Sequence, residues 1–553
     1  MVLGLESRDN FRSFAKQASW NAPMSTSTAR MDTGIGTDLE RTPSDPTVAL
    51  FWSFLVFHVG LWTLVPMLTQ PNAPLDTMEM LFWGREMELG YYKHPPLPAW
   101  LAEMATWVVG NRVWPTYLLS QICVATCLWA AWRFARDVLS PWLALSAAAL
   151  LDACYYYNYT TPEFNHNVTL RPLWALTTLF LFWAASSGKK RYWIAFGVAA
   201  AAGMYAKYQL FFLLPPMLLF SVWNPRARRC WTTAGPYLAI LLFLILLTPH
   251  LWWAWQHDFP TIGYAVERTR GEATWSEHLV NPMKFLGAQM LAVVPAVVVA
   301  LLLTGKRFKL RILDEGQRFA RDFLLAAVLG PLALILAISV LKGAHVRSML
   351  GAPLFTLGGV LLLLAVDACD TVRINRQVVG RCAAISIVLA AALSVANVAG
   401  PYLSGKPRRI HFPGELLARE LQQRWQRSHA EERKEIPVVG GPWWVAANAA
   451  FHLPGRPPVY CDLDPSKSPW LDDRELLAKG GVLVWDAEQA LDADDLRKRF
   501  PNVHLEPPIT LPYATGADLK RLTVGVAVID PPAAGRTSVA VQSETGSSGA
   551  RRR

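Results

Sequence analysis

Long apolar blocks recur along most of this chain, and they constrain its fold more than any other feature. A transmembrane helix needs about 20 mostly apolar residues, and the chain offers such stretches repeatedly from Val48 to Leu403. The pattern predicts eleven spans, near 48–69, 114–132, 138–157, 168–187, 191–208, 210–224, 234–255, 284–304, 322–341, 349–366 and 382–403. The shorter piece from Pro98 to Gly110 is typical of an amphipathic helix in the membrane interface. We therefore expect a polytopic α-helical membrane protein.

The placement of basic residues predicts how the chain is oriented. The formal net charge is +11, yet only 17% of the residues are charged, against about 25% in soluble domains. Lys and Arg collect in alternate loops, whereas Tyr155–Val168 contains neither. Basic loops stay on the cytoplasmic side, so the N-terminus is expected inside and a role in nucleic-acid binding loses its main support. The basic residues of the inside loops are Arg133, Arg136, Lys189, Lys190, Arg191, Arg226, Arg228, Arg229, Lys306, Arg307, Lys309, Arg311, Arg318, Arg321, Arg373, Arg376 and Arg381.

The two ends of the chain differ in amino-acid composition from the middle. An odd number of spans places the C-terminus outside, and residues 404–532 predict a small periplasmic α/β domain. A helix is expected over 415–433, with short strands at 437–440, 481–485 and 524–529. Segments 1–47 (cytoplasmic) and 533–553 (a C-terminal tail) are rich in small and polar residues and are predicted to be disordered. The seven cysteines form no readable disulfide framework.

Candidate catalytic residues are most concentrated in the first outside loop. Asp76 and Glu79 follow the first span, and the pair Lys93-His94 begins 17 residues after Asp76. A carboxylate can deprotonate an acceptor hydroxyl, and cations can stabilise a leaving phosphate. Transfer from a phosphate-linked donor needs both, although ordinary interfacial charges would explain the same residues.

At this loop the chain resembles a known family. Asp76 followed by YYKHPPL at 91–97 is similar to the protein O-mannosyltransferase-like group of GT-C glycosyltransferases, which includes lipid A aminoarabinose transferases and rhizobial lipopolysaccharide galacturonosyltransferases. The match extends over roughly residues 48–530. Its other motifs are TPEFNHN at 161–167, Lys207-Tyr208, PHLWW at 249–253, VVGGPWW at 438–444 and GVLVW at 481–485.

The resemblance implies a GT-C transmembrane domain over 48–403. It implies transfer of a sugar from a polyprenyl-phosphate donor to a lipid, polysaccharide or protein acceptor, such as lipid A or lipopolysaccharide, at the periplasmic face of a bacterial inner membrane. Asp76 takes the position of the family's candidate base, and direct displacement would invert the anomeric carbon. Many relatives have an acid before Lys-Pro-Pro, whereas this chain has Lys93-His94 before the proline pair. The residue that meets the donor phosphate and the use of a metal therefore stay open.

A second acid, Glu163, lies in the outside loop that lacks Lys and Arg. Its neighbours Asn165, His166 and Asn167 offer hydrogen bonds to sugar hydroxyls. The alternative is a capping or turn role at the start of the next span, and Arg171, one to two helical turns further on, could pair with Glu163. We predict that these three neighbours, together with Glu79, Tyr91 and Tyr92, bind the sugar or the acceptor.

Cations at the outer boundary are the candidates for binding the donor phosphate, although each could instead anchor lipid headgroups. Lys207 follows a Gly/Ala-rich run and is expected to face the helix bundle. The outside loop 257–282 is a candidate lid. The phosphate-binding candidates are Lys93, His94, Lys207, Arg268, Arg270, Lys342 and Arg347.

Two further questions remain open from the sequence. Six histidines fall near the outer face, which leaves a divalent metal ion open as a cofactor, but no pair has HxxxH or HxH spacing. The competing functions are a secondary transporter or flippase for a lipid-linked sugar, and a structural assembly factor. Transporters commonly show repeated halves and charges near the midplane, and the sequence shows no convincing internal repeat.

Overall fold

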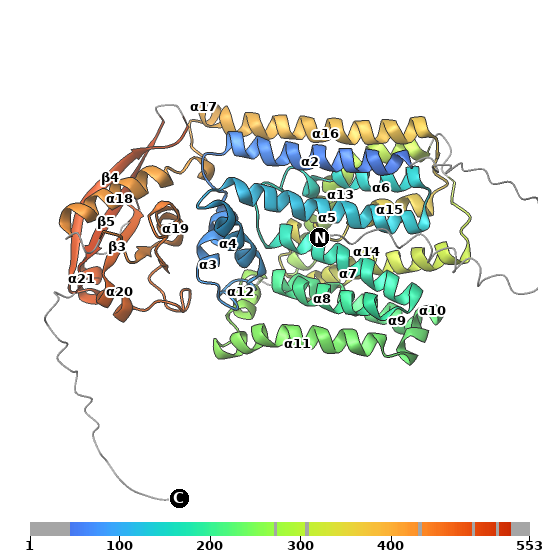
Figure 1. Ribbon diagram of the computed structural model, residues 1–553, viewed down its shortest axis with the longest axis horizontal. Helices are drawn as coiled ribbons and strands as arrows, with labels where there is room; N and C mark the ends of the chain where they lie inside the picture. Colours follow the sequence, from blue (N-terminus) through green and yellow to red (C-terminus); the bar gives the residue numbers. More distant parts are fainter. Residues whose placement is uncertain are drawn as a thin grey trace, which may run out of the picture. The chain divides into compact units, whose positions relative to one another are not determined.

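The computed structural model describes residues 45–269, 274–304, 309–429, 434–488, 493–515 and 519–531. The segments predicted to be disordered therefore lie almost entirely outside the described residues. The fold described is that of the compact unit that begins at Thr47. Its elements keep the labels of Figure 1.

Seven described helices are long and apolar enough to cross a membrane. Their buried shares are as low as 28%, so their outer faces present apolar side chains that suit lipid. The chain thus has the character of a membrane protein. The seven helices are α2 (Pro46–Thr69), α5 (Trp114–Val138), α7 (His166–Ser187), α11 (Gly235–Gln256), α13 (Glu277–Thr304), α14 (Glu315–Lys342) and α16 (Val372–Val398).

Of the other four predicted spans, 191–208 corresponds to the single helix Lys190–Ala206, whereas 138–157, 210–224 and 349–366 each contain a short α-helix and a 3-10 turn. Proline explains part of this, since it lacks an N–H and disfavours a continuous helix. A 3-10 turn precedes Pro215, and another precedes Pro353. The elements are α6 (Pro141–Asp152) with η1 (Tyr155–Tyr157), α8 (Lys190–Ala206), η2 (Tyr208–Phe212) with α9 (Leu214–Trp223), and η4 (Ser348–Gly351) with α15 (Gly358–Ala365).

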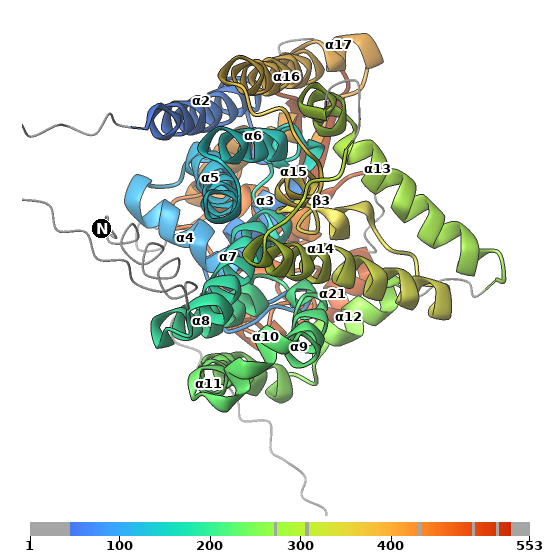
Figure 2. The same cartoon turned by 90° about the vertical axis from the view of Figure 1, so that its right-hand side faces the viewer.

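The short helices mark the two ends of the bundle. Figure 1 shows α3 (Leu75–Gly84), α4 (Leu97–Val109) and α12 (Pro260–Thr269) at one end, away from the basic α10 (Pro225–Arg228) and η3 (Arg229–Thr232). Figure 2, turned by 90°, shows α5 and α16 nearly end-on, whereas α13 runs across the view. The predicted loop 257–282 was wrong in its described part, since it contains α12 and the first turns of α13.

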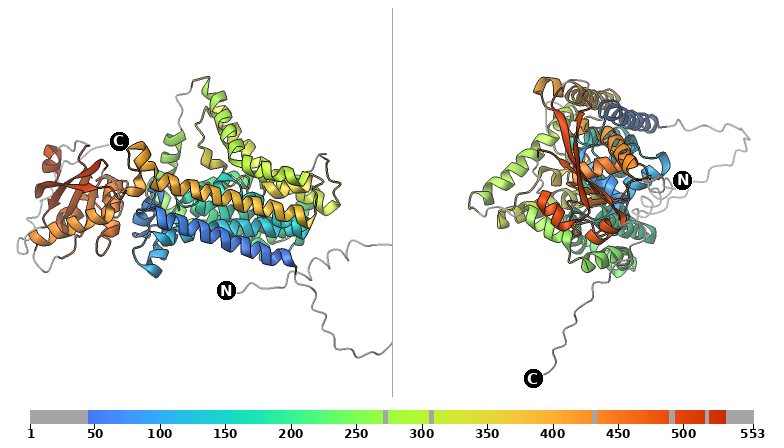
Figure 3. Two further views of the ribbon diagram at one scale, coloured as in Figure 1. Left: turned by 90° about the horizontal axis from the view of Figure 1, so that it is seen from above. Right: turned by 90° about the vertical axis from the view of Figure 1, so that its left-hand side faces the viewer.

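The C-terminal part contains a small sheet domain. Its five strands have the order β2-β1-β3-β5-β4; β1 pairs in parallel with β2 and β3, and β5 pairs antiparallel with β3 and β4 (Figure 3). The strands are β1 (Val439–Gly441), β2 (Val459–Cys461), β3 (Gly481–Asp486), β4 (Val503–Pro512) and β5 (Arg521–Ile529). The helices are α17 (Gly400–Ser404), η5 (Arg409–His411), α18 (Gly414–Ser428), α19 (Trp443–His452), α20 (Asp473–Lys479) and α21 (Ala493–Arg499).

The three predicted strands are confirmed as β1, β3 and β5, but the sequence missed β2 and β4. β2 has only three residues, too few for a readable alternation. β4 is an edge strand whose register shifts between Glu506 and Ile509, around two prolines. Prolines are tolerated at edges and bulges but count against a strand in sequence.

A buried polar chain ties the bundle core to the loop before α7. The imidazole Nδ1 of His58 lies 2.6 Å from Asp152 Oδ1, with both side chains fully buried. Nε2 of His58 lies 3.1 Å from Gln121, whose amide donates to Thr161 at 3.2 Å. Ionisable groups buried in a bundle are costly unless they are paired, and here they are joined by contacts between side chains. These contacts reach Thr161 and so hold the 158–165 loop in one place.

The sheet domain shares a core with α3 and α4. Phe82 and Trp83 of α3 belong to the same buried cluster as Phe451 and Val459. The Asn72 amide donates to Asn448 Oδ1 at 2.7 Å. The helix that follows the first span is therefore packed directly against the C-terminal part of the chain.

Candidate active site

Helix α3 presents two carboxylates on one face. Asp76 is in its first turn, where the partial positive charge of a helix N-terminus favours an acid. Glu79 follows three residues later, so the two side chains are neighbours. Glu79 is only 6% exposed and Asp76 is half-buried.

Glu163 caps this helix from another part of the chain. The N-cap position of α3 is Pro74, which makes no side-chain cap. Glu163 Oε1 instead accepts the backbone N–H of Asp76 at 2.9 Å, satisfying one of the donors that a helix start leaves free. The alternative pairing with Arg171 was wrong, because that guanidinium donates to the carbonyl of Tyr156 and to Thr160.

The residues after Glu163 fix the Asp76 side chain. Asn165 donates its amide to Asp76 Oδ2 at 3.2 Å. Its Oδ1 accepts from the N–H groups of Asn167 and Val168, so Asn165 also caps α7. Thr77 adds a hydrogen bond to the carbonyl of Phe164 at 3.1 Å. Oδ2 of the Asp76 carboxylate is therefore hydrogen-bonded to this loop, whereas Oδ1 makes no hydrogen bond to it.

Two lysines approach the acids with different partners. Lys93 Nζ lies 2.5 Å from Glu79 Oε1, which forms an ion pair. Lys207, just past the end of α8, donates to the neutral Asn167 Oδ1 at 2.7 Å. The positive charges of both lysines act on Asp76. The charge of Lys93 is thus already paired with that of an acid. Lys207 is bound to a neutral group, so its positive charge is better able to attract an anionic ligand.

Burial shifts the protonation of all three acids. Burial raises the pKa of Glu79 to about 7 despite Lys93. Burial, and then the charge of Asp76, raises the pKa of Glu163 to about 7. Burial also raises the pKa of Asp76, while Lys93, Lys207 and the Asn165 hydrogen bond oppose the rise. Groups poised near neutrality can exchange protons at physiological pH.

Aromatic rings surround Lys93. Its Nζ lies 5.0 Å from the ring centre of Tyr92, 5.3 Å from Trp443 and 6.0 Å from Tyr264. Trp443 belongs to the sheet domain and Tyr264 to α12, so distant parts of the chain meet here. These three rings are half-buried, which leaves part of each accessible.

His94 and Tyr91 do not have the ligand-binding roles predicted for them. His94 stacks on His166 with ring centres 3.9 Å apart, and burial, with Lys207 and Lys93, lowers the pKa of His94 well below its usual value. His94 is therefore neutral at pH 7 and is not the phosphate-binding cation expected. Tyr91 is 1% exposed and donates its hydroxyl to the carbonyl of Trp83. It packs the loop and is not free to bind a sugar.

The remaining predicted cations are spread around the site. Arg268 on α12 lies 5.3 Å from the Tyr264 ring, and its charge reaches Asp76. Arg347 is exposed, and its charge acts on Tyr264. Lys342 ends α14 with an exposed side chain and, within the described ranges, joins none of these contacts. Arg270 lies outside the described residues.

Other expected features have clear outcomes. The acidic residues Asp462 and Asp464 lie in a turn of the sheet domain: Asp462 has φ 53° and accepts the N–H of Trp443 at 3.0 Å. The described residues contain no group of three His, Cys, Asp or Glu side chains that could hold a metal ion. The donors thus do not fit a metal site, and no step below runs through one.

Sequence reasoning assigned no role to two contributors, Tyr264 and Trp443. The Trp443 motif was visible, but nothing local indicated that it reaches Lys93. Their position depends on packing between segments far apart in the chain.

Comparisons with known proteins support the expected resemblance. Residues 93–253 match the dolichyl-phosphate-mannose-protein mannosyltransferase family. The chain is 25% identical over 257 residues to lipid A galacturonosyltransferase RgtD of Rhizobium johnstonii, covering 45% of this chain and 52% of that relative. It thus spans about half the length of this curated relative.

The fold is that of a solved structure. The crystal structure of ArnT from Cupriavidus metallidurans bound to undecaprenyl phosphate matches with a TM-score of 0.58 and 14% identity, covering 89% of this chain and 100% of that one. The GT-C type of fold expected from the sequence is therefore confirmed.

Proposed function

We propose that this protein is a glycosyltransferase that moves a sugar from a polyprenyl-phosphate donor to an envelope acceptor. The observation that carries the proposal is the convergence of Asp76, Glu79 and Glu163 with Lys93 and Lys207 at one end of a GT-C-type bundle. The name of RgtD makes lipid A the first acceptor to test, and undecaprenyl phosphate bound to ArnT indicates the kind of carrier.

In the proposed reaction the acceptor hydroxyl attacks the anomeric carbon. A new C–O bond forms to the acceptor as the C–O bond to the phosphate breaks, which inverts the carbon. The hydroxyl proton passes to Asp76, whose carboxylate is held by Asn165 and whose backbone is held by Glu163. A positioned base of this kind contributes about 10²- to 10⁴-fold to the rate.

The leaving group is a polyprenyl phosphate, whose negative charge grows as the bond breaks. Lys207 is the main proposed ligand, since its hydrogen-bond partner is neutral. Lys93 is held by Glu79 and three half-buried rings, and we assign it to shaping the sugar site. Preorganised cations stabilise developing charge without reorganisation.

The proposed setting is the periplasmic face of a bacterial inner membrane. The basic residues of α10 and η3 lie at the bundle end opposite the site (Figure 1). Basic loops stay in the cytoplasm, so the acids, α12 and the domain over 404–532 would face outward.

The test uses purified protein in lipid nanodiscs with polyprenyl-phosphate sugars and lipid A. We expect transfer by wild type and a loss of at least 100-fold for Asp76→Asn. The matched control is Asp322→Asn, a half-exposed acid on α14 that pairs with its neighbour Arg321; it should transfer at the wild-type rate. Folded wild type that transfers no sugar from any donor, yet moves a lipid-linked sugar across vesicles, would refute the proposal in favour of a flippase.

A further inference from the structure

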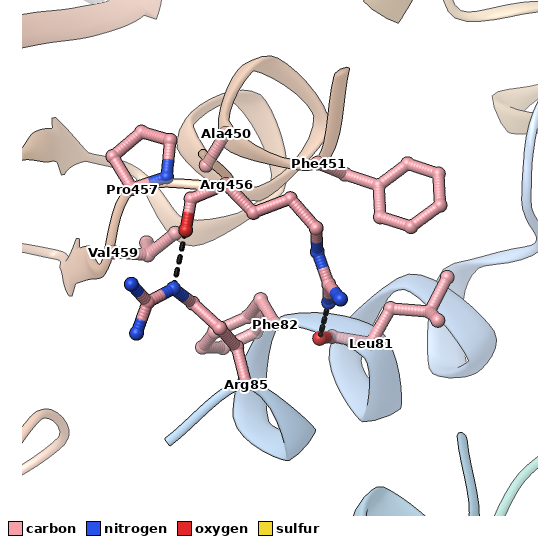
Figure 4. A pocket seen from close by; sticks show the side chains of 8 residues that line it. All are labelled: Leu81, Phe82, Arg85, Ala450, Phe451, Arg456, Pro457 and Val459. Atoms are coloured by element: carbon pink, nitrogen blue, oxygen red, sulfur yellow. Dashed lines mark hydrogen bonds between the residues drawn. The ribbon is translucent and has the colours of Figure 1, made fainter. Parts of the chain in front are cut away.

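A small pocket lies where the sheet domain meets the end of α3. It is lined by Leu81, Phe82 and Arg85 from the bundle side, and by Phe451, Arg456 and Val459 from the sheet domain. Figure 4 shows the two arginine side chains passing each other in opposite directions. Neither takes part in the chemistry proposed above.

Arg456 reaches out of its own domain. It is 8% exposed and donates to the Leu81 carbonyl at 2.8 Å (Figure 4). It also donates to the Thr106 hydroxyl at 2.9 Å and pairs with Glu103 Oε2 at 2.8 Å. In return, Arg85 donates its Nε to the carbonyl of Arg456. One side chain of the sheet domain thus contacts both α3 and α4.

The Leu81 carbonyl is a meaningful target for a cation. The last four carbonyls of a helix have no intrahelical partner, and α3 ends at Gly84. A positive charge at this end also complements the helix dipole. Nearby, the Trp83 carbonyl accepts from Tyr91 and Glu86, and the Gly84 carbonyl accepts from Met87. Arg456 therefore caps the C-terminal end of α3.

The backbone of Arg456 indicates that this side chain is needed. Its φ is +47°, in the left-handed region that favours glycine. Glycine would occupy that conformation without strain, yet an arginine stands there whose guanidinium binds Leu81, Glu103 and Thr106 of the bundle. Its only described side-chain contact within its own domain is with the Phe451 ring, 5.5 Å away. The local cost is offset by contacts with α3 and α4.

We propose that Arg456 is a positioning residue that clamps α3 from its C-terminal end, as Glu163 does from its N-terminal end. The helix that carries Asp76 and Glu79 is then held at one end by the bundle and at the other by the sheet domain. The sheet domain would thus help set the geometry of the acids. The catalytic half of this inference rests on the proposed function.

The test must separate capping of α3 from simple balance of the Glu103 charge. Arg456→Gln removes the cap and leaves Glu103 buried and unpaired. Arg456→Gln combined with Glu103→Gln removes the cap and leaves no unpaired charge. Glu103→Gln alone keeps the Leu81 and Thr106 contacts of Arg456. The matched control is Arg499→Gln, since Arg499 makes its bonds to Asp473, Tyr460 and Leu463 within the sheet domain.

Two readouts are measured for each variant: sugar-transfer kcat, and hydrogen–deuterium exchange of residues 75–84 followed by mass spectrometry. We expect Arg456→Gln to lower kcat at least tenfold and to speed exchange in α3 at least fivefold. The double variant should regain the part of the thermal stability that the unpaired Glu103 charge costs, but keep both defects. Glu103→Gln and Arg499→Gln should stay within about threefold of wild type in both readouts.

Either of two results overturns the inference. If the double variant regains both stability and kcat, Arg456 merely balances Glu103. If exchange in α3 does not change in either Arg456 variant, there is no clamp. The exchange readout needs no transfer activity, so a wild type that fails to transfer sugar would count against the proposed function and leave the clamp to be judged on exchange alone.

Discussion

Replacing Glu163 by glutamine should move the pH dependence of the reaction without abolishing it. The amide oxygen of glutamine can still accept the Asp76 N–H that Glu163 accepts at 2.9 Å, so α3 keeps its cap. At pH 7 the carboxyl, with its pKa raised to about 7, is only partly ionised. Exchanging it for a neutral acceptor should therefore cost only about 1 kcal/mol of stability, the net value of one hydrogen bond.

The sign of the pH effect follows from the role of Asp76 as base. A carboxylate base is active when deprotonated, so activity is present above its pKa and lost below it. In wild type Asp76 and Glu163 lie close enough to titrate as a pair, and the pKa of Glu163 is raised to about 7. A negative neighbour favours the protonated form of a carboxyl group, so removing the charge of Glu163 should lower the pKa of Asp76.

The assay is the pH profile of kcat/KM between pH 5 and 9 for wild type, Glu163→Gln and Asp76→Asn. We expect the acid limb of Glu163→Gln to move to lower pH than that of wild type, with a plateau within about tenfold of wild type. Asp76→Asn should lose at least 100-fold at every pH, because no base remains. If Glu163→Gln loses activity at every pH as Asp76→Asn does, Glu163 is the base; if its acid limb stays where that of wild type lies, the pair does not govern the profile.

Three further outcomes are expected. Lys207→Met should raise the donor KM about 10- to 100-fold in initial-rate assays, since one charged hydrogen bond is worth about 1.5–3 kcal/mol; an unchanged donor KM would contradict its role at the phosphate. Gly84→Val should lower the melting temperature, because a Cβ at Gly84 would lie 2.3 Å from the Ala99 carbonyl oxygen and overpacking costs about 1–3 kcal/mol; a wild-type melting curve would show that α3 and α4 can separate. Asp152→Asn should destabilise the bundle by about 3–5 kcal/mol by disrupting the buried contact with His58, measured by denaturation in detergent, and an unchanged midpoint would show that this contact does not stabilise the bundle.

The candidate site shows how distant segments combine. Glu163 lies 87 residues from Asp76 in sequence, and Trp443 of the sheet domain lies hundreds of residues from Lys93, yet each pair is in contact or close approach. The sequence placed the acids and lysines on one face of the membrane because charge and hydropathy set topology. It could not show that Glu163 binds the Asp76 backbone or that Glu79 pairs with Lys93.

Some predictions failed for identifiable physical reasons. Tyr91 was predicted to bind the sugar or the acceptor, but its ring stacks on Trp83 and its hydroxyl donates to the Trp83 carbonyl, so it is not available to a ligand. His94 looked cationic because it follows Lys93, but burial beside two lysines keeps it neutral. Burial is a property of the packed chain and leaves no local signal.

The sequence by itself determined that the protein has the character of a membrane protein and that Asp76 lies just past the first span, and it predicted which end of the bundle carries the chemistry. These follow from hydropathy and charge, which act residue by residue along the chain. Only the tertiary structure decided how the charges are shared: which lysine is already paired, which acid caps α3, and that Arg456 of the sheet domain reaches the same helix from 375 residues beyond Leu81. Those assignments depend on distances of a few ångströms between remote segments, and such distances exist only once the chain has packed.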